Sequence, residues 1–149
     1  MTSQTAIQDR YPDEHANCYG CGRNNPRGLH LKSFTEGDEV VCRYTPPLEC
    51  TGGGPNFLYG GLIASLFDCN SAAAASAAVS RDGETPPRFV TASLKVDFLK
   101  PTPVGVALEL FAKAIEVKER KVVVESRLVA AGEIRATAQA VMVRLAAKK

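Results

Sequence analysis

One long apolar stretch constrains the fold of this chain more than any other feature. It opens with Gly60 and Gly61 and continues to Val79 through leucines, an isoleucine, a phenylalanine and a block of alanines. This length and composition predict a helix of about five turns. Because such a helix has no polar face, other elements must cover it on several sides.

A single acid, Asp68, interrupts the apolar helix. A carboxylate there is costly to bury unless it is paired or used in chemistry. Its neighbours three and four positions away are all small, and small side chains let a second backbone or a ligand approach: Ala64, Ser65, Ser71 and Ala72. Asp68 is therefore a candidate catalytic acid, and the alternative is a structural carboxylate held by a neighbouring hydroxyl or amide.

Alternating apolar and polar residues predict strands on both sides of the helix. Gly37 and Asp38 indicate a hairpin between the first two strands, and Ala131 and Gly132 indicate a tight turn before the last. The predicted strands cover residues 29–34, 39–44, 89–99, 106–116, 120–130 and 134–145.

Two strand faces are predicted in detail. In the strand after the helix, one face carries Ala92, Leu94, Val96 and Phe98, and the opposite face carries Thr91. In the last strand, Ile134, Ala136, Ala138, Ala140 and Met142 share a face. The last three strands have short connections and should form an antiparallel meander.

These elements predict an α+β domain in which five or six antiparallel strands wrap around one long central helix. Residues 1–16 are expected to form a tail or lead-in, and residues 17–149 a single domain. Because one sheet does not cover every side of so apolar a helix, we expect a homo-oligomer.

Composition narrows the function classes. The net charge is +2 and the chain has no tryptophan, so we expect no nucleic-acid partner. The apolar stretch contains Asp68 and Asn70, which argues against a membrane span. The N-terminus has no basic-then-apolar signal pattern, so we expect a cytoplasmic protein whose five cysteines are reduced.

Cys18 and Cys21 form a CxxC pair in a turn rich in glycine and asparagine. A structural zinc site needs four ligands, and Cys42, Cys50 and Cys69 do not form a second pair at the usual spacing. We therefore favour a structural turn and expect neither a metal nor a cofactor.

Three segments resemble the hotdog-fold acyl-CoA thioesterases, most closely the phenylacetyl-CoA thioesterase-like group. They are Cys18–Leu29 with its Asn25-Pro26-Arg27-Gly28-Leu29 motif, Tyr59-Gly60-Gly61 with Asp68 downstream, and residues 90–101. The family usually has histidine before the two glycines, whereas this chain has Tyr59. The resemblance implies a hotdog fold, hydrolysis of an acyl-CoA, and a dimer or tetramer.

Chemistry and resemblance together assign the site. The backbone N–H of Gly61, at the positive end of the helix, suits a developing oxyanion. Asp68 is then the nucleophile or the general base, and the resemblance implies that it faces the glycine loop of a second subunit. Thr91 is expected to bond to Asp68 or to the attacking water. We assign substrate binding to Tyr59, Gly60, Asn56 and Ser65.

Two other functions remain open. A non-catalytic module that binds acyl-CoA or a hydrophobic ligand would share the fold, and Tyr59 in place of histidine favours it. A hotdog dehydratase needs a histidine beside an acid, but His15 and His30 both precede the helix.

Overall fold

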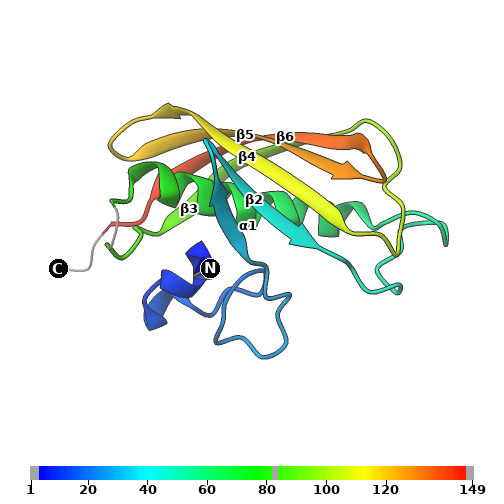
Figure 1. The fold of residues 1–149 in the computed structure, drawn as a ribbon, viewed down its shortest axis with the longest axis horizontal. Coiled ribbons are helices and arrows are strands. Elements are labelled where there is room, and N and C mark those ends of the chain that lie inside the picture. The colour runs from blue at the N-terminus through cyan, green and yellow to red at the C-terminus, as the bar shows by residue number, and fades with distance from the viewer. Residues whose placement is uncertain (1–3, 82–83, 147–149) are drawn as a thin grey trace.

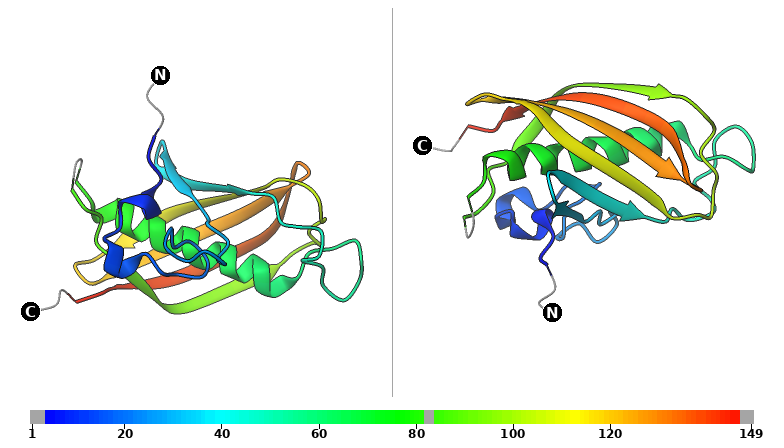
Figure 2. Two further views of the ribbon diagram at one scale, coloured as in Figure 1. Left: turned by 90° about the horizontal axis from the view of Figure 1, so that it is seen from below. Right: turned by 45° about the horizontal axis from the view of Figure 1, so that its top comes forward.

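The computed structural model describes residues 4–81 and 84–146. One six-stranded antiparallel sheet curves around a single long helix, α1 (Gly60–Val79), and the N-terminal segment lies against the other side of that helix (Figures 1 and 2). The predicted α+β hotdog fold, with six strands around one central helix, is confirmed. The predicted bounds of α1 are also correct.

The sheet has the order β1-β2-β4-β5-β6-β3, so β1 and β3 are its two edges. Strands β4, β5 and β6 form the expected meander, and β3 pairs with the far side of β6. The strands are β1 (Ser33–Glu36), β2 (Glu39–Tyr44), β3 (Phe89–Phe98), β4 (Leu108–Val117), β5 (Lys121–Ala130) and β6 (Glu133–Arg144).

The first predicted strand, residues 29–34, was wrong, because β1 begins only at Ser33. His30 has a φ of 56°, which interrupts extended backbone. The N–H groups of Leu29 and Leu31 donate instead to the carbonyls of Tyr19 and Gly20, at 2.8 and 3.0 Å. These residues therefore complete the N-terminal turn rather than the sheet.

The predicted face of Thr91 was wrong, because β3 contains a β-bulge. The pairing with β6 shifts between Thr91 and Ser93, so Ala92 is the extra residue. Phe89 is buried before the bulge, whereas Leu94 packs against the core after it. Thr91 consequently shares the helix-facing side with Leu94, although strict alternation places them on opposite faces.

A second irregularity removes Ile134 from its predicted face. The register between β5 and β6 shifts at Leu128 and Val129, which leaves Arg135 as an extra residue. Ile134 is 45% exposed, in contrast to the fully buried Ala136. The other members of the predicted face, Ala138, Ala140 and Met142, are buried as expected.

The core lies between α1 and the concave face of the sheet. Leu66 and Phe67 of the helix are fully buried, and so are the facing residues of β4, β5 and β6: Leu108, Leu110, Ala112, Val122, Val124, Leu128, Ala136, Ala140 and Met142. In the described residues α1 is the one helix long and apolar enough to span a membrane, and 67% of its most apolar window is buried within the protein. That burial accounts for its apolar character.

The N-terminal segment covers the part of α1 that the sheet leaves open. Two short 3-10 turns, η1 (Ile7–Arg10) and η2 (Asp13–His15), precede the strands. Ile7 and Tyr11 are buried against the alanine-rich half of α1, and the Tyr11 hydroxyl lies 3.3 Å from the Ser76 hydroxyl. The helix is thus covered by both the sheet and this segment.

Leu66→Ala tests how strongly the fold depends on the buried helix. Removing a fully buried leucine should lower the free energy of unfolding by about 2–5 kcal/mol, because it leaves a cavity between α1 and the sheet. Leu48→Ala is the matched control, since Leu48 is 68% exposed and its loss should change stability by less than about 0.5 kcal/mol. Urea denaturation measures both, and equal effects would contradict the packing described.

Candidate active site

The first turn of α1 presents unpaired backbone donors. Tyr59 precedes the helix without a capping side chain, and its carbonyl accepts from Leu62 at 3.2 Å. Within the described part of the chain, no acceptor is found for the N–H groups of Gly60 and Gly61. These two groups and the positive end of the helix dipole form a ready site for an anionic oxygen.

Two backbone bonds hold the approach to this turn. Leu58 donates to the carbonyl of Thr102 at 2.7 Å, and Tyr59 donates to the carbonyl of Cys50 at 3.0 Å. Asn56 lies on the exposed part of the same loop, and no hydrogen bond of its side chain is found among the described residues. The structure therefore places Asn56 near the helix start without fixing its side chain.

The ring of Tyr59 lies over the backbone of Gly61. A Cβ atom added to Gly61 would collide with this ring, so only glycine fits while the ring holds this position. Tyr59 is nevertheless 58% exposed, which leaves its ring free to move toward solvent. The Tyr59 ring thus occupies the space into which a side chain at position 61 would project.

Asp68 lies two turns further along α1 and is partly exposed. The Thr91 hydroxyl donates a hydrogen bond to its Oδ1 atom, a contact made possible by the bulge at Ala92. The structure therefore confirms the contact between Thr91 and Asp68, while their roles stay a prediction. The partial exposure of Asp68 leaves it accessible, in contrast to the buried Asn70 that follows it.

Neither nearby serine reaches Asp68. The Ser65 hydroxyl donates to the carbonyl of Gly61 at 3.0 Å, and the Ser71 hydroxyl lies 3.4 Å from that of Ser126 on the sheet. The neighbouring hydroxyl that holds Asp68 is therefore that of Thr91 and not that of a serine. Ser65 remains exposed on the side of α1 that carries Gly61.

Asp68 and Gly61 do not meet within one subunit. Seven residues separate them, which corresponds to roughly 10 Å along a helix. A single thioester carbonyl cannot contact the carboxylate and the N–H group of the same helix across that separation. One helix therefore does not bring the carboxylate and the free N–H group to the same carbonyl.

An apolar pocket of about 350 Å³ opens beside Gly60. Its walls come from the approach loop, the helix and the end of β3: Phe57, Leu58, Gly60, Ile63, Phe98, Leu99, Lys100, Pro101 and Thr102. This pocket was not predicted from the sequence. The sequence feature that could have predicted the pocket is the apolar pair Phe98 and Leu99 at the end of β3. Both side chains are more than half exposed.

Asn70 was also missed as a structural anchor. It is 1% exposed, and its Nδ2 donates to the carbonyls of Val40 and Leu110 at 3.2 and 3.3 Å. These bonds fix the helix turn that carries Asp68 against β2 and β4. Asn70 thus ties α1 to the sheet two residues after Asp68.

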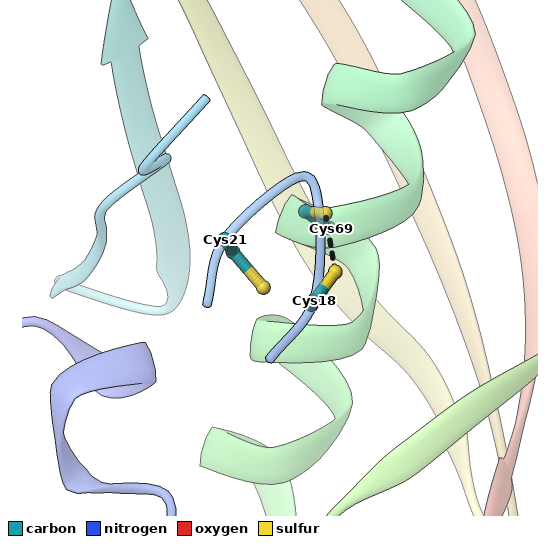
Figure 3. Close-up of side chains that lie close together, drawn as sticks. All are labelled: Cys18, Cys21 and Cys69. Atoms are coloured by element: carbon teal, nitrogen blue, oxygen red, sulfur yellow. Dashed lines mark hydrogen bonds between the residues drawn. The ribbon is translucent and has the colours of Figure 1, made fainter. Parts of the chain in front are cut away.

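A cluster of three thiols includes Cys69, the residue that follows Asp68 in α1 (Figure 3). Cys18, Cys21 and Cys69 place their three sulfur atoms within 4.8 Å of one another, although Cys69 is far from the other two in the sequence. All five cysteines are free. The spacing of the cysteines along the sequence did not predict the cluster, because its third member, Cys69, lies on α1.

The pKa values of the three thiols in the cluster are shifted in different directions. Hydrogen bonds from the thiols of Cys21 and Cys69, and from backbone N–H groups of the turn, hold the pKa of Cys18 far below its usual range. The donated bond to Cys18 raises the pKa of Cys21 to about 11, and the same cause raises that of Cys69. Within the cluster, Cys18 is thus the thiol whose pKa is lowered.

Comparison with known proteins establishes the family. Residues 55–137, more than half of the chain, match the family model of the thioesterase superfamily. The crystal structure of a thioesterase superfamily protein from Shewanella loihica is 42% identical, with a TM-score of 0.71, and the match covers 90% of this chain and 98% of that chain. The chain belongs to the thioesterase superfamily.

Two more distant structures share the fold. The PaaI protein of the phenylacetic acid degradation operon of E. coli is 19% identical, with a TM-score of 0.68, over 80% of this chain and 83% of that chain. Smu.793 from Streptococcus mutans, solved with bound acetyl CoA, is 19% identical, with a TM-score of 0.65, over 80% of this chain and 91% of that chain. No match was found among the curated proteins.

Proposed function

We propose that this protein hydrolyses an acyl-CoA, or a related acyl thioester, to a free acid and a thiol. Membership of the thioesterase superfamily supports the reaction class. The observation that carries the assignment of the acid is the position of Asp68, which is partly exposed in the middle of an apolar helix and bonded to Thr91. A carboxylate kept accessible at such a place is better explained by use than by packing.

Asp68 attacks the thioester carbonyl directly or removes a proton from the attacking water. Thr91 is a positioning residue in either route, because its hydroxyl fixes one carboxylate oxygen and leaves the other free. Gly61 supplies the main N–H donor to the oxyanion, helped by the dipole of α1. Gly60 has no side chain and therefore permits close approach of the thioester carbonyl.

The separation of Asp68 and Gly61 along α1 supports a site shared between two subunits. Among the described residues no strand pairs with the outer side of the edge strand β3. Val90 and Phe98 near its two ends, and Leu99 just after it, are exposed apolar residues. Pairing of two β3 edges would cover these residues and extend the sheet. It would also bring α1 of one subunit next to the glycine turn of the other.

The apolar pocket beside Gly60 offers a place for the acyl chain or the pantetheine arm of the substrate. Its walls include the exposed Phe98, and Lys100 lies at its edge. The acetyl CoA bound to the structurally similar smu.793 supports a coenzyme A ester as the substrate class. Tyr59, Asn56 and Ser65 lie outside the walls of this pocket, and we assign them to further contacts with the substrate near the helix start.

A second function, a binding module without catalysis, is favoured by one observation. The ring of Tyr59 covers the Gly61 backbone, where the oxyanion would be bound. If the ring stays there when a ligand binds, the oxyanion site is closed and hydrolysis fails. Measurements on Asp68 and Tyr59 distinguish the two functions.

Asp68→Asn should reduce turnover of acyl-CoA by at least about a hundredfold, because the amide neither attacks a carbonyl nor accepts a proton from water. Asp38→Asn is the matched control, since Asp38 is an exposed carboxylate in the turn between β1 and β2, paired with Lys113 at 2.9 Å. Thiol release from a panel of acyl-CoAs measures both. A wild-type protein that binds an acyl-CoA but releases no thiol from any of them would establish the binding module instead.

Tyr59→His should raise kcat/KM severalfold, because imidazole retains an N–H donor and covers less of the Gly61 backbone than a phenol. Tyr59→Phe is the comparison variant, which keeps the covering ring and loses only the hydroxyl. Steady-state kinetics with one acyl-CoA measure the effect. A tenfold loss in Tyr59→Phe without a gain in Tyr59→His would assign the hydroxyl to substrate binding.

Phe98→Lys should convert the wild-type oligomer to a monomer of 15.9 kDa, because it places a charge on the unpaired β3 edge. Val117→Lys makes the same change at the end of β4, where the side chain is 51% exposed, and should leave the oligomer intact. Sedimentation velocity reports the mass of each protein. A monomeric wild type that is fully active would refute the shared site.

A further inference from the structure

We propose that Cys18, Cys21 and Cys69 bind one thiophilic metal ion, Zn²⁺ or Cu⁺, which fastens the N-terminal segment to α1 beside Asp68. This inference does not depend on the proposed hydrolysis. It is carried by the convergence of three sulfur atoms from two segments that are distant in the sequence (Figure 3).

The distances suit a common metal ion. Zinc–sulfur bonds of about 2.3 Å in a tetrahedral site place neighbouring sulfurs about 3.8 Å apart. The sulfurs of Cys18 and Cys69 are 3.9 Å apart, which already fits this separation. Cys21 lies within 4.8 Å of both, so a small rotation of its side chain completes a three-sulfur set.

The turn that carries Cys18 and Cys21 is held rigidly by its backbone. Gly22 donates to the carbonyl of Cys18 at 2.7 Å, and Leu31 donates to the carbonyl of Gly20 at 3.0 Å. Two cysteines separated by two residues on such a turn are a common ligand pair for zinc. The sequence alone lacked a third ligand, and α1 provides it.

Gly20 shows that Cys69 is fitted closely to this turn. A Cβ atom added at Gly20 would collide with the sulfur of Cys69, so a side chain there would push the thiol out of the cluster. Cys21 and Cys69 are also buried, and Cys18 is half-buried. The open side of Cys18 gives the ion an entry path and a place for an external fourth ligand.

The surroundings can balance the charge of the bound ion. Three thiolates leave a net charge of −1 with Zn²⁺ and −2 with Cu⁺. The guanidinium of Arg88 is close enough to act on Cys21, and its Nη1 atom is buried without a hydrogen-bond partner among the described residues. Arg88 also lies over the ring of Tyr11, 4.8 Å from its centroid, which keeps the cation near the thiols.

Three mutually adjacent thiols favour a metal over a disulfide, because a disulfide uses two sulfurs and leaves the third without a role. Thiolate sulfur selects Zn²⁺ and Cu⁺ over the harder cations. Each thiol that binds loses its proton to the solvent, so uptake releases protons. No oxidant or reductant takes part.

The test uses the full-length protein, stripped of metal by a chelator and fully reduced under anaerobic conditions. Zn²⁺ and Cu⁺ are titrated separately against a chromophoric chelator, and Co²⁺ serves as a spectroscopic probe. We expect one equivalent of Zn²⁺ or Cu⁺ with submicromolar affinity, a thiolate-to-cobalt charge-transfer band, and an increase of several degrees in the unfolding midpoint. One equivalent of either ion bound at this affinity supports the site.

Matched variants distinguish a loss of metal binding from a loss of folding. Cys69→Ser and Cys18→Ser should each weaken uptake at least about a hundredfold and remove the cobalt band. Cys42→Ser, which changes a fully buried thiol in β2, and Cys50→Ser, which changes a half-buried one, should leave both unchanged. Circular dichroism confirms that each variant is folded, and Cys21→Ser replaces any variant that is not.

The proposal is overturned if the reduced wild type binds neither ion in a stoichiometric amount. It is also overturned if Cys69→Ser binds as tightly as the wild type, because the site would then lie elsewhere. A disulfide within the cluster that forms in air, together with no uptake after reduction, would make the cluster a redox pair rather than a metal site.

Discussion

The burial of α1 is the constraint on which the rest of the structure depends. A helix that is apolar all round must lose its contact with water on every side. The curved sheet covers one side with fully buried residues such as Leu110 and Val124, and the N-terminal segment covers another through Ile7 and Tyr11. The side of α1 toward the β3 edge stays partly open, and Asp68 lies there.

Because α1 is incompletely covered, the candidate active site is open to solvent. A carboxylate buried beneath the sheet would be costly, whereas Asp68 at the open side keeps access to solvent while Asn70, two residues later, ties the same turn to β2 and β4. The rigid helix therefore presents one reactive group at a fixed place. The free N–H groups of Gly60 and Gly61 stand at the other end of the same open side.

The thiol cluster follows from the same packing. The N-terminal turn must lie close to α1 to cover it, and Gly20 allows that approach by leaving room for the sulfur of Cys69. The contact brings Cys69 beside Cys18 and Cys21, one residue from Asp68.

The sequence by itself determined the helix bounds, the strand alternation in β4 and β5, the fold class and the candidacy of Asp68, because hydrophobic period and turn residues act locally. It misplaced β1 and put Thr91 and Ile134 on the wrong faces, since one extra residue in a strand reverses every side chain beyond it. Only the tertiary structure decided the contact between Thr91 and Asp68, the ring of Tyr59 over Gly61 and the meeting of three cysteines. Each of these joins groups whose distance depends on how the whole chain packs rather than on their spacing along it.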